Sequence, residues 1–138
     1  MTIVFDSHTI KTITLFETLT HVEVKDCIIN EDSIYFLVEE GKLENLKSNN
    51  GVSIKNLEKV FNKRIRVLEY SKDLVDFLKK SIKGVKEIRV RNEKNGKIVE
   101  LSVDNSFKSF LIGKNGKNIK VLRQILKRNY QVDDVVVR

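Results

Sequence analysis

The chain has 138 residues, close to the length of one average domain, and 41% of them are hydrophobic, which is enough to build a core and excludes general disorder. Its 26 Lys and Arg against 19 Asp and Glu give a net charge of +7, and no apolar run approaches the roughly 20 residues of a membrane span. Its single cysteine, Cys27, cannot form an internal disulfide, and the N-terminus lacks a secretory signal pattern, so we expect a cytoplasmic protein.

The first half of the chain alternates between helical and strand patterns. The spacing of Ile10, Ile13 and Phe16 favours a helix over residues 7–19, although the Thr and Ile content leans toward strand. We then expect strands over 22–29 and 34–38 joined by a polar turn, a short helix near 42–47, a longer helix with Ile54, Leu57 and Phe61 facing inward, and a strand over 65–68.

The second half gives the same series with clearer signals. Ser71 is a natural N-cap for a helix whose apolar stripe includes Phe77 and Leu78, and Gly84 ends that helix. Asp133 and Asp134 have the composition of a turn before the last strand. We expect strands over 85–90 and 98–103 joined at Asn95-Gly96, a short helix over 105–112, a longer helix with Ile119, Leu122 and Leu126 inward, and a strand over 132–137.

The two halves match at a constant offset of 65 positions. Subtracting 65 from the inward triplet 119, 122 and 126 gives 54, 57 and 61, and the same offset relates Gly116 to Gly51. This internal repeat predicts an α+β chain of two domains, residues 1–70 and residues 71–138. Each would have the order helix, strand, strand, helix, helix, strand, with a three-stranded sheet packed on helices.

The positive charge is concentrated in the second half. Residues 1–70 hold 9 Lys and Arg against 11 Asp and Glu, a net of −2, while residues 71–138 hold 17 against 8, a net of +9. Such a local excess indicates a polyanionic partner, with nucleic acid ahead of an acidic membrane.

A glycine pair carries the functional signal. Gly113-Lys-Asn-Gly116 stands between two expected helices, where glycine lets a phosphate backbone approach and the amides of the next helix attract an anion. The pattern fits neither a Walker A loop nor a dinucleotide fingerprint. A Gly-x-x-Gly loop between two helices, within the element order above, is typical of a KH domain, where it clamps about four nucleotides. The order resembles the type II variant of that fold.

The chain also resembles the archaeal form of the NusA transcription factor family. The resemblance runs from about Ile3 to the C-terminus and is strongest in the second unit. Its residues are Leu15–Thr20, Val24–Ile29, Leu68–Ser71, Ile112–Lys120 and Val132–Val137. It implies two tandem type II KH domains, single-stranded RNA binding, and a role with RNA polymerase in transcription elongation and termination.

The RNA site is expected on the loop of the second unit and the helix that follows it. Lys114 and Lys117 would hold phosphates beside the loop amides, and apolar residues would face the bases. The site residues that we predict are Ile112, Gly113, Lys114, Asn115, Gly116, Lys117, Asn118, Ile119, Lys120 and Arg123.

The first unit departs from this pattern. Ser48-Asn49-Asn50-Gly51 replaces the first glycine by serine and the lysine by asparagine. The Lys and Arg residues at positions 117, 120, 123, 127 and 128 correspond to Val52, Lys55, Glu58, Asn62 and Lys63. These positions carry five positive charges in the second unit and a net charge of +1 in the first. We therefore predict that the first unit has a weaker RNA site, or that it serves as a scaffold. The residues of this weaker site would be Ser48, Asn49, Asn50, Gly51 and Lys55.

Other functions stay open at this level. A KH protein of translation or ribosome assembly would share the fold, and a helix-turn-helix DNA-binding protein would use residues 106–112 and 116–128 as its helix pair. A nuclease would need a catalytic cluster, and His8 and His21 have none beside them in the sequence. We therefore expect a monomeric binding protein that has no catalytic residues, no metal and no cofactor.

Overall fold

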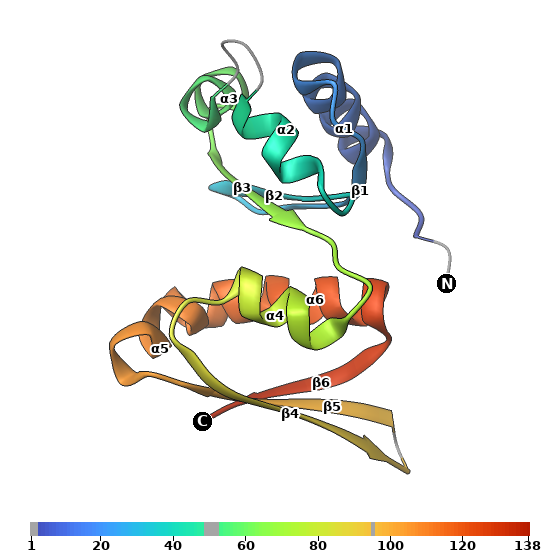
Figure 1. Cartoon of the computed structure of the whole chain (residues 1–138). Coiled ribbons are helices and arrows are strands. Elements are labelled where there is room, and N and C mark those ends of the chain that lie inside the picture. Colours follow the sequence, from blue (N-terminus) through green and yellow to red (C-terminus); the bar gives the residue numbers. More distant parts are fainter. Residues whose placement is uncertain (1–2, 49–52, 95) are drawn as a thin grey trace. The chain divides into compact units, whose positions relative to one another are not determined.

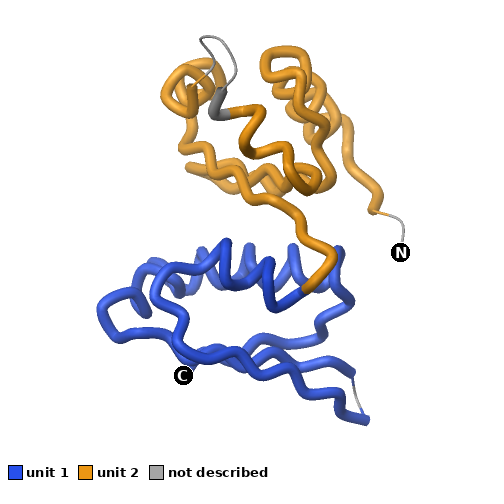
Figure 2. Tube along the Cα trace, viewed as in Figure 1, with its two compact units in different colours: residues 1, 74–138 blue, residues 2–73 orange. Residues whose placement is uncertain are grey.

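The computed structural model describes residues 3–48, 53–94 and 96–138. The chain forms two compact units, one reaching to Asp73 and the other running from Leu74 to Arg138 (Figure 2). In these described ranges each unit has three α-helices and a three-stranded sheet, the second unit also has one short 3-10 helix, and Figure 1 shows the helices lying over one face of the sheet in each. The element order expected from the repeat is therefore confirmed for both halves.

In the first unit the central strand of the sheet pairs antiparallel with the first strand and parallel with the last. Phe36, for example, lies opposite Cys27 on one side and Val67 on the other. Its elements are α1 (Ser7–Thr20), β1 (Val24–Ile29), β2 (Ser33–Val38), α2 (Lys42–Ser48), α3 (Ile54–Phe61) and β3 (Arg64–Glu69).

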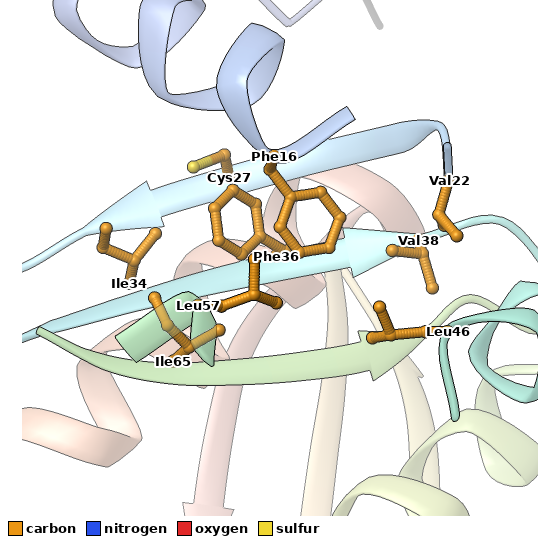
Figure 3. Close-up of a cluster of buried hydrophobic side chains, with 9 residues drawn as sticks. All are labelled: Phe16, Val22, Cys27, Ile34, Phe36, Val38, Leu46, Leu57 and Ile65. Atoms are coloured by element: carbon orange, nitrogen blue, oxygen red, sulfur yellow. The ribbon is translucent and has the colours of Figure 1, made fainter. Parts of the chain in front are cut away.

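The core of the first unit lies between its helices and its sheet. The rings of Phe16 from α1 and Phe36 from β2 stack with their centroids 4.0 Å apart (Figure 3). Leu57 reaches the same cluster from α3, and Cys27 is buried in it. These side chains hold the helices on one face of the sheet.

The second unit repeats this sheet with a longer hairpin. Leu101 of the central strand lies opposite Ile88 and Val137, and the ring of Phe77 packs 5.0 Å from that of Tyr130. Its elements are α4 (Leu74–Ser81), β4 (Val85–Glu93), β5 (Gly96–Val103), α5 (Asn105–Ile112), the short 3-10 turn η1 (Lys114–Gly116), α6 (Lys117–Tyr130) and β6 (Val132–Val137).

Three local expectations are wrong. Helix α4 begins at Leu74, so Ser71, which is buried, cannot be its N-cap. Ile54 is 37% exposed at the start of α3, because that short helix turns Leu57 into the core instead. Asp133 and Asp134 lie within β6, where their carboxylates accept hydrogen bonds from the backbone N–H groups of Lys97 and Val135.

Helix α1 confirms the helical interpretation of the N-terminal segment but buries a different face. Thr12, Phe16 and Thr20 are its buried residues, while Ile10 is exposed. The hydroxyls of Thr12 and Thr20 donate to the carbonyls of His8 and Phe16, one turn back. Internal hydrogen bonding of this kind lets β-branched polar residues occupy a buried helix face.

Candidate nucleic-acid interface

Gly113 ends α5 in a backbone conformation that favours glycine. Its φ of 78° and ψ of 169° lie in a region that is almost exclusive to this residue. A Cβ placed there would be 2.8 Å from Cγ of Asn118 and 2.9 Å from its backbone nitrogen. The N–H of Gly113 donates to the carbonyl of Ser109 at 2.8 Å, which closes the last turn of α5. The first glycine of the motif therefore permits a sharp exit from the helix.

The rest of the loop is a tight, hydrogen-bonded turn. Asn115 and Gly116 both adopt left-handed conformations, with φ values of 58° and 73°. The N–H of Gly116 donates to the carbonyl of Gly113 at 3.1 Å, and Nδ2 of Asn118 donates to the carbonyl of Phe110 at 2.8 Å. The Asn118 bond ties the start of α6 to the end of α5, so the turn is held from both helices.

Positive charge surrounds this turn. Lys114 and Asn115 are exposed at its tip, and Gly116 precedes α6 without a capping side chain. The first turn of α6 carries Lys117 and Lys120 and no acidic residue. Backbone dipoles and lysine charges therefore act in the same direction at the start of α6, which is suited to an anion.

Arg123 lies further along α6 and is directed to the last strand of the sheet. Its Nη2 donates to the carbonyl of Val135 at 3.1 Å, and its Nε lies 3.7 Å from Oδ1 of Asp134. The side chain is about half exposed, so its guanidinium extends the positive surface of α6 toward the free edge of β6.

The expected site residues divide by depth. Lys114, Asn115, Lys120 and Arg123 are exposed, whereas Ile119 is buried at 6%. Ile112, Gly113, Gly116, Lys117 and Asn118 have intermediate exposure. Nine of the ten residues thus lie at one helix junction, with Ile119 beneath it, and Arg123 lies one turn further along α6.

The weaker set in the first unit is described only in part. Ser48 is the last residue of α2, whereas its counterpart Gly113 lies just after the end of α5. Lys55 is exposed on α3. Asn49, Asn50 and Gly51 lie outside the described residues.

Sequence reasoning missed two exposed aromatic residues. Tyr35 and Tyr130 are buried, and Nζ of Lys25 lies 4.5 Å over the ring of Tyr70. Instead, Phe107 and Phe110 on α5 are 38% and 54% exposed. Their position on the helix that leads into the glycine turn was the signal that could have identified them.

An aspartate stabilises the start of α5. Oδ1 of Asp104 accepts hydrogen bonds from the backbone N–H of Ser106 at 3.0 Å and from its hydroxyl at 2.9 Å. These bonds lower the pKa of Asp104 below its ordinary value, and the backbone N–H of Ser106 has the larger effect. The helix that carries both exposed phenylalanines is therefore capped by an ionised carboxylate at neutral pH.

Within the described residues, His, Cys, Asp and Glu side chains form no group of three that could hold a metal ion. No helix in the same ranges is long and apolar enough to cross a membrane.

The fold and the glycine turn define an α+β protein consistent with two KH-like units in tandem. A protein of Thermoplasma acidophilum named probable transcription termination protein NusA is 33% identical over 99% of this chain and 96% of its own length. A Halococcus morrhuae protein of the same name is 24% identical over 98% of both chains. The crystal structure of APE1850 superposes with a TM-score of 0.75 at 35% identity, covering 97% of this chain and all of the other.

No family model matches the chain. The identity and coverage of these relatives nevertheless establish its kinship: the chain belongs to the archaeal NusA-like family of transcription termination proteins. The family resemblance found in the sequence is confirmed.

Proposed function

We propose that this protein is an RNA-binding transcription factor that holds single-stranded nascent RNA during elongation and termination. Both units are type II KH domains in this proposal, residues 1–70 and residues 71–138, and the protein acts as a cytoplasmic monomer beside RNA polymerase. It binds RNA without catalysing a reaction. The names of its relatives support the transcriptional role.

The turn at Gly113–Gly116 is the observation that carries the RNA-binding part. Its two glycines have positive φ, so the backbone turns sharply and leaves little side-chain bulk at the surface. A phosphodiester strand could then approach the backbone N–H groups closely, with Lys114 beside it. A structural turn alone would need neither the exposed Lys114 nor the lysines of the next helical turn.

We assign each predicted site residue a role according to how exposed it is. Lys114, Lys117 and Lys120 would neutralise successive phosphates, and Arg123 would extend this track along α6. Asn118 holds the turn through its bond to the carbonyl of Phe110. Asn115 would contact the RNA at the tip of the turn, and Ile112 would lie beside the bases. Gly113 and Gly116 would lie against the phosphates, and Ile119 would support the turn from below.

The first test is the salt dependence of RNA binding. A protein that neutralises three or four phosphates of a single strand should show a log–log salt slope of roughly −2 to −3. We expect this slope with single-stranded RNA in fluorescence anisotropy titrations, and weaker binding of duplex DNA. A flat salt response would contradict the phosphate clamp, and a preference for the duplex would favour the helix-turn-helix alternative.

The transcriptional role needs a separate measurement. Affinity purification from cells after crosslinking should recover RNA polymerase subunits together with nascent transcripts. Recovery of ribosomal subunits instead would favour the translation or ribosome-assembly alternative.

A further inference from the structure

A basic pocket lies in the second unit, away from the glycine turn. It has a volume of about 590 Å³ and opens between the end of α4, the start of β4 and the start of α5. Its lining residues are Lys79, Lys80, Ile82, Lys83, Gly84, Val85, Lys86, Glu87, Ile88 and Phe107. The size is that of an ordinary small-ligand site.

The lining combines lysines with an apolar floor. Four lysines and one glutamate give these residues a formal net charge of +3. Asp76, which is not part of the lining, pairs with Lys80 at 3.3 Å and offsets one of these charges, while Glu87 of the lining is paired with Arg89 at 2.8 Å. The remaining lysines, Lys79, Lys83 and Lys86, are exposed and favour an anionic occupant.

Phe107 gives the pocket a flat aromatic surface. Its ring lies so close to Gly84 that a Cβ on that glycine would be 2.4 Å from Cδ2 of the ring. The carbonyl of Gly84 also accepts the N–H of Asp104 at 2.8 Å, which fixes the start of α5 against the turn. The ring is thus positioned by the backbone while 38% of the residue stays exposed.

Helix α4 is shorter than its counterpart in the first unit. It has 8 residues where α1 has 14, and β4 is exposed along most of its length, whereas three of the six residues of β1 are buried. Phe107 lies near the start of α5, and the glycine turn follows its end. A helix of 8 residues spans about 12 Å, so one extended strand of RNA could reach both places.

We infer that this pocket is a second RNA-contacting site, in which a base stacks on Phe107 and the neighbouring phosphates contact Lys79, Lys83 and Lys86. The inference rests on the proposed RNA binding and lengthens its footprint beyond the glycine turn. Each nucleotide of a single strand offers a flat face and a phosphate together, which matches an aromatic floor within a basic rim. An acidic polypeptide would match the charges but not the ring.

Oligouridines of two lengths separate the two sites. The short one has about four nucleotides, enough for a glycine loop, and the long one has roughly three times that length. Two pocket variants are compared by fluorescence anisotropy at low salt: Phe107→Leu, which keeps an apolar side chain without the ring, and Lys83→Glu with Lys86→Glu. Lys11→Glu with Lys59→Glu makes the same charge change at exposed positions of the first unit.

The long RNA should bind the wild type more tightly than the short one. Both pocket variants should lose about fivefold or more in affinity for the long RNA and change less than about twofold for the short one. The Lys11 and Lys59 control should bind both RNAs nearly as the wild type does. Lys114→Asp with Asn115→Asp should weaken binding of both lengths.

Four results would overturn the inference. Equal affinity of the wild type for the two lengths, or pocket variants without effect while the loop variant acts, would remove the pocket and leave the proposed function intact. Polyglutamate binding that the pocket variants abolish, with RNA binding unchanged, would assign the pocket to an acidic protein. Failure of the wild type to bind either RNA would refute the proposed function as well.

Discussion

The two units share one architecture but distribute their helix lengths in opposite ways. The first helix has 14 residues in the first unit and 8 in the second, whereas the third helix has 8 and 14. Three of the six residues of β1 are buried, whereas no residue of β4 is buried. The long α6 buries six residues and also carries five basic ones. The two units therefore have the same sheet topology, but the second carries more positive charge on its helical surface.

Two equivalent positions on the third helices carry side chains of opposite charge. Glu58 on α3 and Arg123 on α6 are 65 positions apart. Oε2 of Glu58 accepts the N–H of Ile65 at 3.1 Å, and Nη2 of Arg123 donates to the carbonyl of Val135 at 3.1 Å. Both side chains satisfy a backbone group of the last strand, an edge strand in each sheet. Opposite charges thus perform the same structural task, and only the arginine adds positive charge for a polyanion.

The largest expected difference concerns the start of the third helix. Ile119→Ala removes a side chain that is 6% exposed and should lower the free energy of unfolding by about 3 kcal/mol. Ile54→Ala, at the corresponding position but 37% exposed, should cost less than about 1 kcal/mol. Chemical denaturation followed by circular dichroism measures both. Equal losses would show that the two helices pack alike.

The loops themselves should differ next in RNA affinity. Lys114→Asp with Asn115→Asp should weaken single-stranded RNA binding roughly 30-fold at low salt, since a charge-assisted hydrogen bond is lost and repulsion is added. Asn49→Asp with Asn50→Asp should cost less than about threefold, because that sequence supplies no lysine and Ser48 replaces the first glycine. Titration of both variants with one RNA measures the difference. Equal losses would mean that both units form one continuous RNA track.

The two glycines of the second loop should be unequal in stability. Gly113→Ala forces a Cβ against Asn118 in a glycine-only conformation and should cost about 2 kcal/mol. Gly116→Ala keeps an ordinary 3.8 Å contact to Ile119 and bears only the left-handed strain, about 1 kcal/mol. Thermal unfolding of the two variants compares these costs. A larger loss at Gly116 would contradict the geometry of the turn.

The smallest effect is a shared dependence on pH. Asp6 caps α1 through the N–H of Thr9, and Asp104 caps α5 through that of Ser106, and these bonds lower the pKa of both carboxyls. A depressed folded-state pKa means that each cap stabilises above the ordinary carboxyl pKa and is lost as the pH falls through the folded value. The unfolding midpoint should therefore decline below roughly pH 4.

Asparagine variants provide the control for the caps. Asp6→Asn and Asp104→Asn keep an oxygen acceptor but cannot titrate, so each should reduce the acid-induced decline measured by thermal unfolding. If the decline is as steep in both variants as in the wild type, other carboxylates control acid stability.

Local chemistry in the sequence determined the element order, the repeat and the glycine turn. Apolar periodicity placed Leu122 and Leu126 on the buried face of α6. The bounds of α5 and β6 followed from clear breaks in the apolar pattern. The two glycines of the turn were recognisable because few other residues can replace them at positive φ.

Tertiary structure decided the features that depend on neighbours distant in the sequence. Ile54 and Ile119 occupy equivalent positions, yet only packing sets one at the surface and the other inside. Arg123 satisfies a carbonyl of β6, a partner that no local pattern reveals. The pocket at Phe107 forms only where α4, β4 and α5 meet, because a surface made by three separate segments is not encoded in any one of them.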